Sequence, residues 1–306
     1  MSAKAKQVGG QPYRILVANY MVKGEEWTDL PVGGRIRNRI RVRLGGFDFQ
    51  IIRTPENFNL TVAEAKGRFC YTTDIVFDNI RPNQRQRVDA LVDEVTELLS
   101  FATMSQVVRF GDEYGTGSSR QAVKGLTLYF RPTLGATHGA EVKRFLELTW
   151  PAYHRLRRKR KLNIVVDYVV TTELPHLPIE VEMLMSFVTL ECLKSSYAKQ
   201  AGYKFVAPAW RKISIPPKAN PKAEPKLVFE KLLHEMMKKV KMRKSLKRIV
   251  QLRNHIIHNG VSPRPFKSQM KGCFDAKEII REYLLRLLGF KGQYSRFNDM
   301  SLHTLK

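Results

Sequence analysis

Arginines at every second position mark one segment of this chain as a β-strand. Residues 35–44 read RIRNRIRVRL, so charged and apolar side chains alternate with the two-residue period of an extended strand. Gly45 and Gly46 follow directly, and residues 47–52 form a second apolar segment, a pattern typical of a hairpin. This segment predicts a sheet in the first part of the chain.

The charged face of that strand is a possible track for nucleic acid. Alternate residues of a strand lie about 6.6 Å apart, near the spacing of phosphates along an extended single strand. A sheet face that simply points to water explains the same pattern, because charged strand faces usually do so. The residues on this face are Arg35, Arg37, Arg39, Arg41 and Arg43.

The rest of the first part also favours strands. Further strands are expected at residues 13–20, 68–77, 106–110 and 122–130. One helix is expected at residues 85–103, after the proline at position 82. Residues 1–140 therefore predict a mixed, β-rich domain.

The second part has the pattern of a helical bundle. Helices are expected at residues 142–160, 179–198, 227–240, 245–258 and 275–288. Residues 162–172 fit a strand by their valines and a helix by their neighbours. Trp150, Trp210 and Tyr197 are expected in the core and not as platforms for base stacking. The predicted fold class is α+β, with domains at 1–140 and 141–306.

The charge of the chain favours a polyanionic partner. The net charge is +25 over 306 residues. Residues 1–140 hold 19 Lys and Arg against 14 Asp and Glu, and residues 141–306 hold 34 against 14, giving +5 and +20. An anionic membrane surface, or solubility alone, could use the same charge. The basic residues of the second part proposed for nucleic-acid contact are Arg157, Arg158, Lys159, Arg243 and Lys244.

Cysteine usage and hydropathy indicate a cytoplasmic protein. Cys70, Cys192 and Cys273 lie far apart, which argues against a disulfide framework and a zinc knuckle. The chain has no run of about 18 apolar residues, and its first residues lack the apolar core of a secretion signal. No metal, cofactor or membrane span is expected.

Side chains that could take part in catalysis gather in residues 247–260, KRIVQLRNHIIHNG. Asn259 and Gly260 predict the left-handed stop that commonly ends a helix, so the preceding polar residues fall in its last turn. That end of a helix is partially negative and favours cationic side chains. Asn254 and His258 share a face of the helix, whereas Arg253 and His258 lie roughly 140° apart on an ideal helix. Arg253 can therefore meet His258 only by its long reach, or if the helix loosens before Gly260.

These features resemble the HEPN superfamily, in particular its ApeA-like members from prokaryotic defence. A β-rich domain precedes an apolar helix with an embedded glutamate, Glu191 in TLECL, and a later helix ends in QLRNHIIHNG. The family signature is an arginine, a polar residue after it and a histidine four to six residues on. Arg253, Asn254 and His258 match it. The resemblance covers residues 141–290 and extends more loosely to the first domain.

The resemblance implies a metal-independent endoribonuclease that acts on RNA, usually as a homodimer with one composite cleft. His258 would be the general acid or base, Arg253 would clamp the phosphate, and Asn254 would orient a phosphate oxygen or the imidazole. Glu191 would support the site by pre-orienting Arg253. Such nucleases commonly act in phage defence or toxin systems. The β-rich domain would then be a sensor or regulatory domain for the nuclease.

Simpler interpretations stay open for the same residues. His258 could cap the helix or lie in an interface, Arg253 could pair with Glu191 only to hold the bundle, and His255 fits a surface position. A metal site of His255, His258 and Cys273 has too few ligands at the right spacing. The whole chain could instead be a non-catalytic nucleic-acid-binding protein or a HEPN-type regulatory scaffold.

Overall fold

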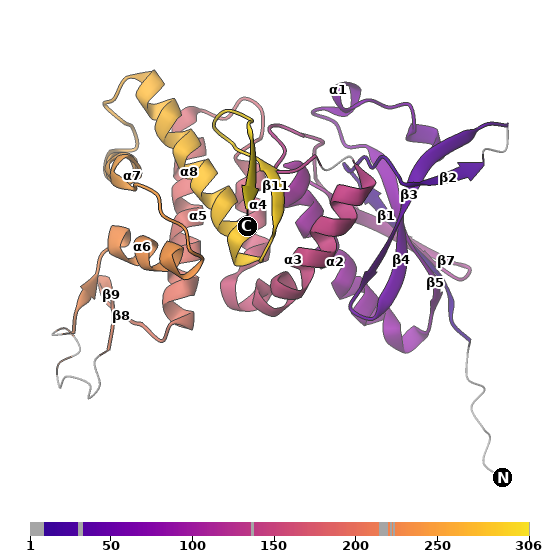
Figure 1. Cartoon of the computed structure of the whole chain (residues 1–306), viewed down its shortest axis with the longest axis horizontal. Helices are drawn as coiled ribbons and strands as arrows, with labels where there is room; N and C mark the ends of the chain where they lie inside the picture. Colours follow the sequence, from indigo (N-terminus) through magenta and orange to yellow (C-terminus); the bar gives the residue numbers. More distant parts are fainter. Residues whose placement is uncertain are drawn as a thin grey trace, which may run out of the picture. The chain divides into compact units, whose positions relative to one another are not determined.

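The computed structural model describes residues 9–29, 33–135, 138–213, 220, 222 and 224–305. The chain divides into two compact units, Met1–Trp150 and Pro151–Lys306 (Figure 1). A sheet dominates the first unit and helices dominate the second, so the predicted α+β class is confirmed. The units divide after Trp150, inside a helix, whereas the sequence placed a boundary near residue 140.

A seven-stranded antiparallel sheet organises the first unit, in the order β2-β3-β4-β5-β1-β6-β7. One long helix, α2, contributes a buried apolar face to the core of this unit. The elements are β1 (Gln11–Ala18), β2 (Glu26–Asp29), β3 (Arg35–Leu44), β4 (Phe47–Arg53), η1 (Pro55–Asn57), α1 (Val62–Ala65), β5 (Tyr71–Ile80), η2 (Pro82–Gln84), α2 (Arg85–Thr103), β6 (Val108–Tyr114) and β7 (Gly117–Arg120).

The alternation in β3 is present as predicted. Its apolar side chains, such as Ile40 and Val42, are buried and its arginines face outward. Gly45 and Gly46 have φ angles of 61° and 81°, the left-handed conformation that a tight hairpin turn requires. β3 and β4 therefore pair directly, from Leu44 opposite Phe47 onward.

The strand predicted at residues 122–130 is wrong. Only Thr127 makes an isolated bridge there, to Lys66. The backbone of this segment bonds to scattered partners: Leu126 N–H donates to Gln106 Oε1, Leu128 N–H donates to Ser105 Oγ, and Thr127 N–H donates to the carbonyl of Arg68. Such partners satisfy a buried backbone without a ladder, so apolar composition alone does not make a strand.

Helix α5 is the centre of the second unit, since it packs against α4, α6, α7 and α8 (Figure 1). Residues 162–172, which fitted either structure, are helical. Two small sheets that the sequence did not predict accompany the helices. The elements are α3 (Gly139–Arg160), which crosses the division between the units, then α4 (Leu162–Thr171), α5 (Ile179–Gln200), β8 (Lys204–Val206), β9 (Ala209–Arg211), β10 (Lys226–Leu227), α6 (Phe229–Lys239), α7 (Lys247–Asn259), α8 (Phe266–Leu287), β11 (Gly292–Ser295) and β12 (Leu302–Leu305).

Helix α8 begins at Phe266, well before the predicted start at residue 275. Gly272 lies inside this helix, although glycine disfavours helix interiors. In the structure a Cβ at Gly272 would lie 1.9 Å from Leu252 Cδ1 on α7. This glycine therefore permits the close approach of α7 and α8.

The aromatic residues expected in the core are buried in two of three cases. Tyr197 and Trp210 are buried, whereas Trp150 is half-buried and packs near the Gly45 turn. None of the helices in the described part of the chain is both long and apolar enough to cross a membrane.

Candidate functional site

Helix α7 presents the motif at its C-terminal end. It continues to Asn259 and ends at Gly260, whose φ is 73° and whose N–H donates to the carbonyl of Ile256 over 2.9 Å. The helix does not loosen before Gly260, so Arg253 and His258 stay roughly 140° apart around its axis. Within one protomer the two side chains therefore project in different directions.

Arg253 is held by contacts on several sides. Its Nη2 lies 3.1 Å from Glu191 Oε1 on α5, and its Nη1 donates to Asn254 Oδ1 over 3.2 Å. The guanidinium also lies over the ring of Phe229, 5.1 Å from the centroid. The side chain is 23% exposed, and its Nε is buried with no hydrogen-bond partner within the described residues. These contacts fix the orientation of a cation that a ligand can still reach.

Glu191 is shared between two cations. Its Oε2 forms an ion pair with Lys194, one turn further along α5, while its Oε1 binds Arg253. Lys194 Nζ lies 5.0 Å from the centroid of the Phe229 ring. We call Glu191, Lys194, Phe229 and Arg253 the Arg253 cluster. One carboxylate against two cations leaves the cluster with net positive charge.

Two members of this cluster were not predicted from the sequence. Lys194 stands three residues after Glu191, a spacing at which helical side chains meet, so a local signal for it was present. Phe229 opens a different helix, α6, and no local pattern connects it to Arg253. Only the packing of α5, α6 and α7 brings these residues together.

His258 is exposed and chemically available. Within the described part of the chain its imidazole makes no hydrogen bond or ion pair, and neither does that of His255, which is half-buried. Asn254 is exposed on the same face of α7 as His258, one turn earlier. Asn254 thus lies between the two chemical groups of the motif, because it also contacts Arg253.

An apolar edge flanks His258. Ile257, Val261 and Phe266 are 43%, 60% and 66% exposed, and they stand at the end of α7, in the turn after it and at the start of α8. The turn is fixed because the buried Gln269 amide donates to the carbonyl of Arg264 over 2.8 Å. We call these three residues the apolar edge.

Cys273 takes no part in this site. It is buried, and its Sγ lies 3.9 Å from Glu182 Oε2 between α8 and α5. Burial raises the pKa of the Cys273 thiol to about 12, so it stays protonated at neutral pH and is a poor metal ligand. Across the described residues, no three His, Cys, Asp or Glu side chains are grouped to hold a metal ion.

The basic residues predicted in the second unit differ in their surroundings. Arg158, Lys159 and Arg243 are exposed and Arg157 is half-buried. Lys244 instead pairs with the buried Glu282, with 2.8 Å between Nζ and Oε2. Lys244 is thus bound into the helical unit, whereas Arg243 beside it is open to solvent.

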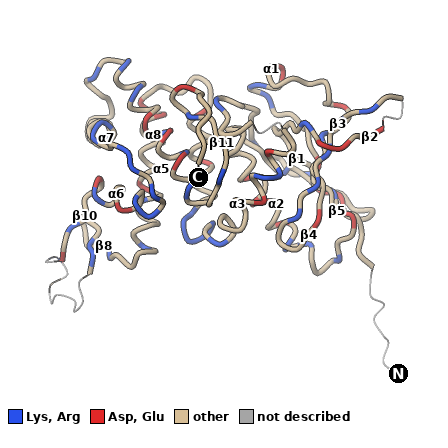
Figure 2. The backbone as a smooth tube through the Cα atoms, viewed as in Figure 1, with Lys and Arg blue, Asp and Glu red and all other residues tan. Residues whose placement is uncertain are grey.

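A denser basic segment surrounds the link from α6 to α7 (Figure 2). Of its residues, Arg243 and Lys244 were predicted from the sequence and the others were not. Its signal in the sequence is the run KKVKMRKSLK at residues 238–247. In the described structure its exposed cations have no carboxylate partner, apart from the paired Lys244. The exposed members are Lys238, Lys239, Lys241, Arg243 and Lys247.

The sheet arginines share one face of β3, as predicted, but each has an acceptor. Arg35 pairs with Asp29 at 2.8 Å, Arg41 with Glu26 at 2.9 Å and Arg43 with Asp48 at 3.7 Å. Arg37 Nε donates to the carbonyl of Glu25 and Arg39 Nη2 to Thr28 Oγ1. Neighbouring acids therefore neutralise much of this face, although exposed pairs of this kind are weak and can exchange for another anion.

No protein-family model, no curated protein and no solved structure matches this chain.

Proposed function

We propose that the second unit is a metal-independent endoribonuclease of the HEPN type. It cleaves RNA by attack of the 2′-hydroxyl, acts as a homodimer, and works in the cytoplasm in phage defence or a toxin-like system. The observation that carries this proposal is the fixed guanidinium of Arg253 together with His258, which stands on the same helix end and makes no hydrogen bond within the described residues.

Arg253 has the properties of a phosphate clamp. Glu191 and Phe229 restrict its motion, while its partial exposure leaves donors for a ligand. A cation that is already oriented stabilises the charge that grows on phosphorus without paying for reorganisation during the reaction. A freely moving surface arginine would lack this property.

His258 supplies the proton transfer in this proposal. A base removes the proton of the ribose 2′-hydroxyl, the oxygen attacks phosphorus, and the bond from phosphorus to the 5′-oxygen breaks. An acid then protonates the departing 5′-oxygen. The products are a 2′,3′-cyclic phosphate and a 5′-hydroxyl, and no water, metal or oxidant is consumed.

The geometry of α7 favours a composite site. Each protomer offers one motif histidine, and Arg253 and His258 point in different directions on a helix that stays regular. A two-fold pairing of α7 ends would supply the second histidine and place an arginine opposite a histidine. The apolar edge beside His258 supports such a contact, since exposed apolar groups gain from being covered.

The test is analysis of RNA ends with purified full-length protein in the presence of a chelator. Wild type should release 2′,3′-cyclic phosphate ends, and Arg253→Ala and His258→Ala should each lose them. His255→Ala is the matched control, because it removes the other histidine of the same helix turn. Intact RNA after incubation with a verified dimer would refute the nuclease.

A non-catalytic RNA-binding protein is the second candidate, because the α6–α7 link exposes cations without carboxylate partners. In that case binding persists in Arg253→Ala and His258→Ala and no RNA is cut by any variant. Binding through phosphates must weaken as salt rises, since counterions are released. A regulatory scaffold would instead show dissociation of the dimer in His258→Ala without any change in RNA.

A further inference from the structure

The first unit contains a cavity of about 510 Å³ beside the start of α3. Its wall includes Lys23, Arg37, Arg53, Phe58 and the first residues of α3, Gly139 and Ala140. Sites for small organic ligands commonly have volumes of roughly 300–1,000 Å³. The cavity is thus large enough for more than a single inorganic ion.

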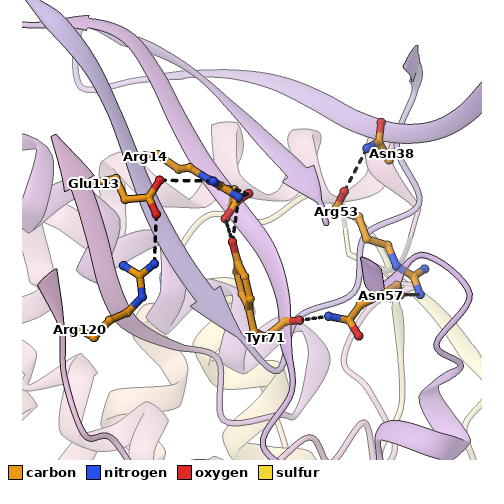
Figure 3. A network of polar contacts seen from close by, with 8 residues as sticks. Arg14, Asn38, Arg53, Asn57, Tyr71, Glu113 and Arg120 are labelled. Atoms are coloured by element: carbon orange, nitrogen blue, oxygen red, sulfur yellow. Dashed lines mark hydrogen bonds and ion pairs between the residues drawn. The ribbon is translucent and has the colours of Figure 1, made fainter. Parts of the chain in front are cut away.

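Arg53 is the most unusual side chain in this wall. It is 8% exposed, and its Nη2 donates to the carbonyl of Asn57 (Figure 3) and to that of Leu60, both in the segment after β4. Its guanidinium also lies over Phe58, 5.3 Å from the ring centroid. Within the described residues it has no carboxylate partner, its Nε is buried without a hydrogen bond, and its Nη1 makes none.

Two other arginines show two ways in which this chain supplies partners to a guanidinium group. Arg14, in the same sheet, has Asp74 at 2.6 Å and Glu113 at 3.3 Å (Figure 3). Arg160, in the second unit, is 2% exposed and has no carboxylate among its hydrogen-bond partners. Each of its three side-chain nitrogens nevertheless donates a hydrogen bond to a neutral acceptor. Arg53 has neither a carboxylate partner nor an acceptor for every nitrogen among the described residues, so part of its donor capacity is left for a ligand.

The charge around Arg53 is positive. Lys23 and Arg37 line the same cavity, and Glu25 is the carboxylate among its lining residues. The N-terminal end of α3 adds partial positive charge, because the first N–H groups of a helix lack partners within it. Burial lowers the pKa of Arg53 below its ordinary value, which is the direction expected for a cation without a close counter-ion.

The floor of the cavity is tightly packed. A Cβ at Gly24 would lie 1.9 Å from the backbone nitrogen of Arg39, and a Cβ at Gly139 would lie 2.4 Å from Ile40 Cγ2. The carbonyl of Lys23 accepts a hydrogen bond from the N–H of Gly139 over 2.9 Å. Backbone thus lies directly against β3 on this side of the cavity, and its packing needs no ligand.

We propose that this cavity, the Arg53 pocket, binds a small phosphorylated molecule of nucleotide size, with its phosphate against Arg53, Lys23 and Arg37 at the start of α3. A phosphate suits the site because its oxygens accept from several donors at once and arginine forks match it. The pocket lies in the unit that does not carry the proposed nuclease motif, so it assigns a ligand-binding role to that unit.

The experiment measures binding of inorganic pyrophosphate and of ATP to the full chain by calorimetry, with chelator present. The test variant is Lys23→Gln/Arg37→Gln, because both side chains are exposed and their loss should leave the fold intact. The control is Arg68→Gln/Lys124→Gln, which removes two exposed charges of the same unit outside the pocket. Thermal unfolding of each variant checks the fold.

Wild type and the control should bind both probes, and the test variant should bind them roughly tenfold or more weakly. Absence of binding to wild type at millimolar probe would overturn the proposal. Equal weakening in both double variants would also overturn it, since that result indicates diffuse surface charge. Binding of an RNA oligomer without either small probe would overturn the assignment to a small molecule.

Discussion

Arg253 and Arg53 occupy similar local settings in the two units and differ in one respect. Each guanidinium lies over a phenylalanine ring, and each has a buried Nε without a partner in the described structure. Arg253 is paired with Glu191, whereas the hydrogen bonds of Arg53 to described residues go to backbone carbonyls and to the sulfur of Met21. The carboxylate fixes the direction of Arg253 and weakens its field, while Arg53 keeps its full charge. The first arrangement suits a reaction that depends on geometry, and the second suits capture of an anion.

The largest expected effect is loss of RNA cleavage in Arg253→Ala. The rate of cleavage should fall about 100- to 1,000-fold, the cost of removing one pre-oriented group that stabilises transition-state charge. Folding should survive, because Glu191 keeps Lys194 as a partner. The measurement is the single-turnover rate on a defined RNA.

Arg248→Ala is the matched control for that variant. Arg248 stands on the same helix and pairs with Asp275 at 2.7 Å, but it lies outside the motif. Its removal should leave the cleavage rate close to that of wild type. Equal losses in both variants would mean that α7 needs its ion pairs for folding and that Arg253 has no special role.

Glu191→Gln separates orientation from charge. Without the carboxylate, the guanidinium of Arg253 is no longer oriented by an ion pair. The value of kcat should therefore fall roughly tenfold to a hundredfold, as for other small displacements of reacting groups. KM should not rise, because the change removes a negative charge next to the phosphate site. Steady-state kinetics measures both, with Glu180→Gln on the same helix as control. A raised KM with unchanged kcat would contradict a positioning role.

Arg160→Met and Arg53→Met compare a fully satisfied buried arginine with one that has spare donors. Arg160→Met should lower the free energy of unfolding by about 3 kcal/mol, because several buried acceptors lose their donor at about 1–3 kcal/mol each. Arg53→Met should cost about 2 kcal/mol, since only the carbonyls of Asn57 and Leu60 lose their donor. Urea unfolding followed by circular dichroism measures both. Equal costs would show that Arg53 is as structural as Arg160.

The smallest effect concerns pH and the ion pair of Lys244. Burial opposes ionisation of Glu282, yet hydrogen bonds from Lys244 and Arg286 hold the pKa of that carboxyl below its usual value. A lowered folded-state pKa contributes stability above the unfolded-state pKa, and this stability is lost as pH falls through the folded value. Lys244→Met removes one donor, so acid unfolding should begin at a higher pH.

Arg243→Met is the partner experiment, because Arg243 is exposed and has no ion pair within the described residues. Its acid unfolding should match wild type. Its RNA binding should depend less on salt, with the slope reduced by about 1 if it contacts one phosphate. Acid titration by circular dichroism and binding at several salt concentrations test the two variants together. A shift in acid unfolding for Arg243→Met alone would contradict the assignment of Lys244 to stability and of Arg243 to RNA contact.

Features that depend on neighbours along the chain could be predicted from the sequence. The period of Arg35–Leu44 gave a strand with one charged face, and Asn259 with Gly260 gave the end of α7. The spacing of Arg253 and His258 also predicted their divergence, because the helical angle per residue is constant. The same local rules were wrong for residues 122–130 and for the start of α8, where bonds and contacts come from distant segments.

Tertiary structure alone decided which charges are paired and which are left open. Arg253 meets Phe229 through packing of separate helices, and the Arg53 pocket joins Lys23, Arg37 and Gly139 from distant positions in the chain. Periodicity fixes which side of an element a residue occupies, but it carries no information on what lies opposite. Whether an arginine keeps its charge for a ligand depends on that opposite surface, because only a close counter-ion or a full set of acceptors can neutralise or satisfy it.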